Sequence, residues 1–104
     1  MNRRVLLKRV KNAVLGVDPS AEVILYGSRA RGDARPYSDW DLLILVDGPA
    51  SEEARRRIRH AIYEIEWDTG QVLCCIVHTR TEWDSEPLSF TPFRERVSQE
   101  GVRI

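Results

Sequence analysis

The hydrophobic and polar positions along the chain follow helical and strand-like patterns in turn. Residues 3–15 carry apolar residues at the spacing of an amphipathic helix, namely Leu6, Val10, Ala13 and Val14. A proline turn at residues 17–20 ends this helix, and residues 22–27 form a short apolar run stopped by glycine. The first part of the chain therefore predicts a helix followed by a buried strand.

The middle of the chain holds a second strand behind an irregular, arginine-rich stretch. Residues 28–38 combine Gly, Pro, Ser and Arg without a period, which predicts a loop or a short helical turn. Residues 39–46 are continuously apolar after an acidic start, so we expect a strand that is covered on both faces.

Residues 52–67 show the pattern of a second amphipathic helix. Ser51 is expected as its N-cap, and Glu52 and Glu53 lie in the first turn, where they favour the helix dipole. Their spacing from Arg56 and Arg57 predicts two i,i+4 ion pairs, with the arginine run on a solvated face. The expected buried stripe is Ala54, Ile58, Ala61, Ile62 and Ile65.

The last part of the chain predicts a third strand and a short final helix. Residues 71–79 form the strand; the helix has Thr91 as N-cap, Pro92 at its first position and Gly101 as C-cap. The order helix-strand-strand-helix-strand-helix predicts an α/β (α+β) layer structure. At 104 residues, we expect residues 1–104 to form a single domain.

Composition excludes some classes of partner. The 16 Lys and Arg balance the 16 Asp and Glu, so no overall field attracts nucleic acid or an anionic membrane, although local basic patches stay open. No stretch has the roughly 20 apolar residues of a membrane span, and we expect a cytoplasmic protein. Cys74 and Cys75 point to opposite faces of the predicted strand, so we expect two unpaired, small core residues without a metal or redox role.

Two aspartates at the head of the second strand carry the candidate chemistry. Asp39 and Asp41 are two positions apart, so they project from one face of a strand. Carboxylates this close repel each other unless a cation neutralises them, and such a pair suits Mg²⁺. The alternative is that both are simply exposed at the strand terminus. Gly27 and Ser28 follow the first strand, where a phosphate can approach the backbone closely.

Competing motifs do not fit. Gly27 and Gly32 have the spacing of a P-loop, but Asp33 and Ala34 stand where Lys and Ser or Thr belong. His60 and His78 are in no pattern that nominates a general base or a zinc ligand, so we expect structural or surface roles for them.

The combination G-S-x-A-R-G and S-D-x-D-L resembles the signature of the polymerase-β-type nucleotidyltransferase superfamily, and in particular of its minimal nucleotidyltransferases. The resemblance implies a small mixed sheet flanked by helices. It implies that Asp39 and Asp41 are the catalytic residues and ligate Mg²⁺. It further implies a nucleotide-binding set of Gly27, Ser28, Arg29, Arg31 and Ser38.

The resemblance also implies a reaction and a partner. An NMP, expected to be AMP from ATP, passes to a hydroxyl acceptor with release of pyrophosphate. Minimal nucleotidyltransferases are often paired with a small helical HEPN-domain toxin, for which they act as antitoxin, with a toxin tyrosine as acceptor. We expect no membrane, nucleic-acid or template partner, and a homo-oligomer stays open.

One part of the family pattern is missing. The superfamily usually supplies a third carboxylate from a later strand, but residues 71–77 contain no acid. The nearest acids, expected on helix faces or loops, are Glu66, Asp68, Glu82 and Asp84. The alternative function is therefore a degenerate binding module that neutralises a helical partner by masking it. Its contact surface, or else a cover for the sheet edge, is expected at Trp83, Leu88, Phe90 and Phe93.

Overall fold

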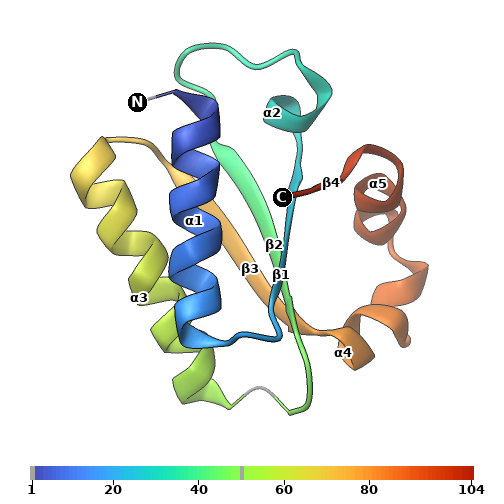
Figure 1. The fold of residues 1–104 in the computed structure, drawn as a ribbon. Coiled ribbons are helices and arrows are strands. Elements are labelled where there is room, and N and C mark those ends of the chain that lie inside the picture. The colour runs from blue at the N-terminus through green and yellow to red at the C-terminus, as the bar shows by residue number, and fades with distance from the viewer. Residues whose placement is uncertain (1, 50) are drawn as a thin grey trace.

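A computed structural model describes residues 2–49 and 51–104 and shows a four-stranded mixed sheet flanked by helices (Figure 1). The elements are α1 (Arg3–Val17), β1 (Glu22–Tyr26), α2 (Ser28–Arg31), β2 (Trp40–Val46), α3 (Glu52–Thr69), β3 (Leu73–Thr79), α4 (Arg80–Asp84), the 3₁₀ turn η1 (Leu88–Phe90), α5 (Pro92–Glu100) and β4 (Val102–Arg103). The strand order is β3-β2-β1-β4. β1 is antiparallel to β2 and β4, whereas β2 and β3 are parallel. The predicted fold class is confirmed.

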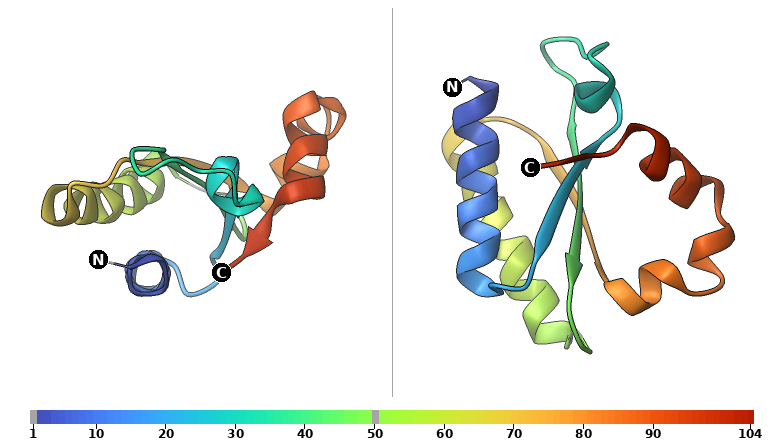
Figure 2. Two further views of the ribbon diagram at one scale, coloured as in Figure 1. Left: turned by 90° about the horizontal axis from the view of Figure 1, so that it is seen from above. Right: turned by 45° about the vertical axis from the view of Figure 1, so that its right-hand side comes forward.

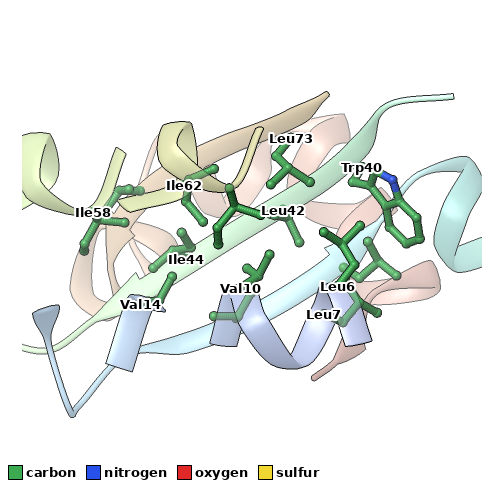
Figure 3. Close-up of a cluster of buried hydrophobic side chains, with 14 of the residues drawn as sticks. Leu6, Leu7, Val10, Val14, Trp40, Leu42, Ile44, Ile58, Ile62 and Leu73 are labelled. Carbon is green, nitrogen blue, oxygen red and sulfur yellow. The ribbon is translucent and has the colours of Figure 1, made fainter. Parts of the chain in front are cut away.

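The main core lies between one face of the sheet and helices α1 and α3. Alternate residues of β2 face these helices, with Leu42 and Ile44 fully buried. Figure 3 shows them between side chains of the two helices, including Val10 on α1 and Ile62 on α3. β2 is therefore covered as its continuous apolar run predicted. Because it is buried in the core, it holds the acidic residues at its start in fixed positions.

The second face of the sheet is covered only in part. α4 and α5 lie away from α1 and α3 (Figure 2), and they bury Leu43 and Leu45 with Trp83 and Val97. Trp83 is only 5% exposed, so of the two roles expected for it, a partner surface or a cover for the sheet, it has the second. It belongs to this second core, whereas Phe90 remains 77% exposed.

The C-terminal part holds elements that periodicity did not predict. α4 has five residues and is held by a capping box, in which Thr79 Oγ1 accepts from the Glu82 N–H and Glu82 Oε1 accepts from the Thr79 N–H. The other unpredicted elements are η1 and β4, which has two residues. All three are too short to show a period: α4 is marked locally by its capping box, whereas η1 and β4 depend on tertiary packing.

The predicted ion pairs of α3 do not form in the described part of the chain. Ser51 Oγ caps the helix as expected, accepting from the Ala54 N–H at 3.1 Å. Glu52, however, contacts Arg59 at 3.5 Å instead of Arg56. Arg55 is half-buried, donates to the Val77 carbonyl and pairs with an acid on α4. The i,i+4 expectation was therefore wrong: Glu52 turns to Arg59, and Arg56 and Arg57 stay on the exposed face, where solvent competes with ion pairing.

The two cysteines differ in environment. Cys75 is half-buried and packs against the main core, as expected, and both thiols are free. Cys74 is exposed, so the prediction of a small core residue is wrong for it. The physical reason is that Cys74 and Ile76 lie on the face of β3 that α1 and α3 do not cover, where Ile76 is also 38% exposed.

Candidate active site

The end of β1 contacts the acidic pair, Asp39 and Asp41, through Gly27. The antiparallel register sets Tyr26 opposite Asp41, so Gly27 lies directly beside the Asp41 side chain. Gly27 has φ +77° and ψ −160°, and a Cβ placed on it would lie only 2.3 Å from Asp41 Oδ2. Only glycine fits this position. The glycine-serine turn and the carboxylate pair therefore form one site.

Asp39 and Asp41 lie on the partly open face of the sheet. Trp40 between them is buried on the opposite face. Burial raises the pKa of the Asp41 carboxyl, and repulsion by Asp39 raises it further, while Arg31 acts in the opposite direction. Among the described residues, no Lys, Arg or His forms an ion pair with either carboxylate. The pair is therefore a fitting place for a divalent cation.

Glu100, at the end of α5, joins the site although sequence reasoning did not nominate it. Its Oε1 accepts from the Gly27 N–H at 2.9 Å, and its carboxylate contacts Arg31 at 3.1 and 3.2 Å. Partial burial would raise the pKa of Glu100, but the hydrogen bonds from Arg31 and Gly27 lower it overall. No local pattern could have shown this contact, because it spans 73 positions of the chain.

The remaining predicted nucleotide-binding residues divide into two groups. Ser28 is half-buried at the start of α2, beside Gly27, and Arg31 is on the same short helix. Arg29 instead donates to the Ser38 carbonyl at 2.9 Å, and its guanidinium lies 4.3 Å from the ring centroid of Trp40. Ser38 Oγ accepts from a backbone N–H of the same loop. The structure therefore brings Arg29 and Ser38 together to hold the loop before β2, on the Trp40 side of the strand.

The four flanking acids considered as a third carboxylate are engaged elsewhere. Glu66 accepts from the Leu73 N–H at 2.9 Å, and Asp68 pairs with Arg9. Glu82 belongs to the capping box, and Asp84 pairs with a cation on α5, Arg94. In residues 2–49 and 51–104, no three His, Cys, Asp or Glu side chains are gathered around one point.

Cys74 holds the position that faces the acidic pair from β3. It is the register partner of Asp41, and its Sγ lies 3.6 Å from Asp39 Oδ2. Its exposure and its neighbours mark it as part of the site, which strand alternation alone could not show.

Comparison with known proteins gives the site a context. A family model described as "Nucleotidyltransferase domain" matches residues 4–103. A bifunctional uridylyltransferase/uridylyl-removing enzyme of Azotobacter vinelandii is 42% identical over 53 residues, which cover 51% of this chain and 6% of that enzyme. A protein of Haemophilus influenzae named "Probable protein adenylyltransferase MntA" is 38% identical over 55 residues, covering 53% of this chain and 48% of that protein. The matched stretch thus spans less than half of either relative.

A solved structure shares the fold. It is described as "Crystal structure of the toxin-antitoxin with AMP-PNP" and matches 92% of this chain and 69% of that chain, with a TM-score of 0.64. The two sequences are 15% identical, so the likeness concerns the fold. It confirms the mixed sheet with flanking helices that the motif implied. No helix in the described residues is both long and apolar enough to cross a membrane.

Proposed function

The chain belongs to the nucleotidyltransferase domain family, and from that premise we propose that it transfers AMP from ATP to a hydroxyl group with release of pyrophosphate. The contact between Gly27 and Asp41 carries the proposal. A glycine with positive φ, placed so that any Cβ would meet a carboxylate oxygen at 2.3 Å, joins the phosphate turn to the acidic pair. Such an arrangement suits transfer from a nucleotide, because this chemistry depends on positioning the phosphates and neutralising their charge.

Asp39 and Asp41 would hold a divalent ion, for which Mg²⁺ is the expected identity. Their chemistry fits, because two oxygen donors share one face and neither forms an ion pair in the described part of the chain. When bound, such an ion supplies charge neutralisation on the phosphate oxygens. The Gly27 N–H, Ser28 and Arg31 would bind the terminal phosphates of the nucleotide.

Glu100 imposes a condition on nucleotide binding. Its carboxylate already accepts hydrogen bonds from the Gly27 N–H and from Arg31, two of the donors assigned to phosphate. An incoming phosphate must therefore displace it or share these donors with it. Arg29 and Ser38 act as positioning residues in this proposal, because they fix the loop that leads into the acidic pair.

The acceptor we propose is a tyrosine hydroxyl on a small helical HEPN-type toxin, which makes this protein an antitoxin. The acidic pair lies on an open surface, with Asp39 exposed, so a side chain from a folded partner can reach it. The name of the Haemophilus influenzae relative supports a protein acceptor, and the toxin-antitoxin neighbour supports a toxin partner. We place the activity in the cytoplasm, in keeping with two free cysteines.

The number of carboxylates at the site favours a second function, in which the protein masks a helical partner without catalysis. Besides Asp39 and Asp41, the carboxylate that the described residues bring near the pair is Glu100, which is already held by the Gly27 N–H and Arg31, and β3 contributes Cys74 instead of an acid. A protein of this kind could bind nucleotide and neutralise a helical partner by covering it, without transfer.

Labelled ATP separates the two functions. The protein is incubated with a purified HEPN-type partner and ATP carrying label on either the α- or the γ-phosphate. Transfer of AMP leaves α-label on the partner and none from the γ-position, and mass spectrometry locates it on tyrosine. The Asp39→Asn/Asp41→Asn variant must lose the label, whereas Asp68→Asn, whose carboxylate pairs with Arg9 of α1, must keep it. Partner neutralisation without label, retained by the double variant, would establish masking instead.

A further inference from the structure

The outward face of α3 carries large aromatic side chains that the described part of the chain leaves uncovered. α3 buries Ile58, Ile62 and Ile65 in the main core, and it lies at the edge of the molecule, away from α5 (Figure 2). Its opposite face presents Trp67, which is 80% exposed, and Tyr63, which is 55% exposed. The two rings stack on each other with their centroids 6.4 Å apart. Tryptophan and tyrosine are enriched among the residues that dominate binding between proteins.

Charged residues extend this face in a symmetric order. We define the α3 stripe as the exposed residues along this side of the helix, Arg56, Arg57, His60, Tyr63, Glu64 and Trp67. Arg56 and Glu64 are each four positions from His60, one before it and one after it. Arg57 and Tyr63 are each three positions from His60 in the same way. The central part of the stripe is therefore complementary to its own reverse, with a base opposite an acid and a guanidinium opposite an aromatic ring.

We propose that α3 pairs with α3 of a second copy of this chain, in antiparallel orientation about a two-fold axis at His60. Two-fold symmetry is the commonest symmetry of homodimers, and it makes each contact occur twice. In this arrangement Arg56 lies against the partner's Glu64 as an ion pair. Arg57 lies against the face of the partner's Tyr63, where a cation–π contact forms.

The side chains of the α3 stripe are available for this pairing. Within the described residues, neither Arg56 nor Arg57 forms an ion pair. Glu64 contacts His60 at 3.1 Å, and both side chains are largely exposed. Side chains on a helix lean towards its N-terminus, so the ring of Trp67 reaches back over the preceding turn and faces the partner's arginines.

The paired segment is short, and it leaves the candidate active site open. From Arg56 to Trp67, α3 rises about 16 Å, so one such helix pair is at the small end of specific interfaces, and we expect a dissociation constant in the micromolar range. α3 packs on the main-core face of the sheet, whereas Asp39 and Asp41 lie on the other face. The pairing is therefore independent of the proposed function.

Charge reversal tests the pairing by sedimentation equilibrium, measured from low micromolar to submillimolar protein. The unaltered protein should dimerise. Arg56→Glu alone and Glu64→Arg alone each set like charges against one another twice, so each should weaken the dimer at least about tenfold. An equimolar mixture of the two single variants restores both ion pairs, so it should associate about as well as the unaltered protein. The matched control is Arg59→Glu, an exposed arginine about 100° around the helix from His60, which should leave dimerisation unchanged.

Removal of the exposed ring gives a second measurement. Trp67→Ala should weaken the dimer at least about tenfold, because tryptophan is the residue type whose truncation most often costs that much at an interface. Circular dichroism verifies that each variant has the helix content and the melting temperature of a folded domain.

Three results would overturn the inference. They are a chain that stays monomeric at every concentration, a dimer that Arg56→Glu leaves unchanged, and folded single variants that do not associate when mixed. A monomeric chain that binds a purified HEPN-type partner, and loses that binding in Arg56→Glu, would assign the α3 stripe to the partner instead of a second copy.

Discussion

Replacing Gly27 by alanine tests whether the glycine turn and the Asp41 carboxylate form one site. The backbone of Gly27, at φ +77° and ψ −160°, lies in a region open essentially to glycine, where another residue costs about 1–3 kcal/mol. The added methyl carbon would lie 2.3 Å from Asp41 Oδ2 and 3.4 Å from Asp41 Cβ. The aspartate must therefore rotate, or the end of β1 must move away from β2.

Together the two effects should lower the free energy of unfolding by roughly 2–4 kcal/mol, a large part of the roughly 5–15 kcal/mol typical of a domain. Urea unfolding followed by circular dichroism measures this loss. In an Asp41→Ala background the oxygen is gone and the 3.4 Å contact with Cβ is ordinary, so only the backbone strain remains. A double-mutant cycle should then give a coupling of about 1 kcal/mol between Gly27 and Asp41.

The matched control is Gly16→Ala. Gly16 lies in α1 with no atom near its Cβ position, so alanine there should raise the free energy of unfolding by about 0.5–1 kcal/mol. If Gly27→Ala stabilised the protein in the same way, or lowered its stability equally with and without the Asp41 carboxylate, there would be no steric conflict between a Cβ at position 27 and Asp41.

Three further predictions concern charged groups. Asp41→Asn should raise the melting temperature of the metal-free protein, because burial and repulsion by Asp39 both disfavour the charged carboxylate. Thermal unfolding in EDTA measures this, and a lower melting temperature would contradict it. Glu100→Gln should strengthen ATP binding several-fold in calorimetry, because the substitution removes the negative charge that competes with phosphate for Arg31. Weaker binding would mean that Glu100 positions this arginine for phosphate. Hydrogen bonds from the Thr79 backbone and Arg55 lower the pKa of Glu82 from 4.5 to about 2, so its stabilisation is present above about pH 4.5 and is lost as the pH falls towards 2. Glu82→Gln should therefore be less stable than the unaltered protein in urea at pH 7 but not near pH 2, and a pH-independent difference would contradict this.

The fold was predictable from sequence where the signal is periodic. The buried residues of α1 and α3 were predicted from the helical spacing of their apolar positions. The burial of β2 was predicted from its continuous apolar run. α4 and β4 were not predicted, because five and two residues carry no period: the start of α4 is marked only by its Thr79-x-x-Glu82 capping box, and β4 depends on its pairing with β1.

The same distinction applies to the site. Gly27 and Asp41 are 14 positions apart on two paired strands, so a local motif could predict that they meet. Glu100 reaches Gly27 only through the folded C-terminal part. The exposure of Cys74 depends on which face of β3 the helices cover, and alternation along a strand does not decide which face that is. Arg29 is the opposite case. The motif predicted that this arginine binds phosphate, but its guanidinium packs on the Trp40 ring, and only the folded structure shows this orientation.

Calorimetric titration of ATP into the purified protein measures whether the glycine turn and the two aspartates bind nucleotide and metal together. It is carried out with Mg²⁺ and with EDTA, on the unaltered protein and on Asp39→Asn/Asp41→Asn. We expect binding that requires both the cation and the two aspartates. Binding that is equal in EDTA, or equal in the double variant, would contradict the claim that Gly27, Asp39 and Asp41 form one nucleotide–metal site.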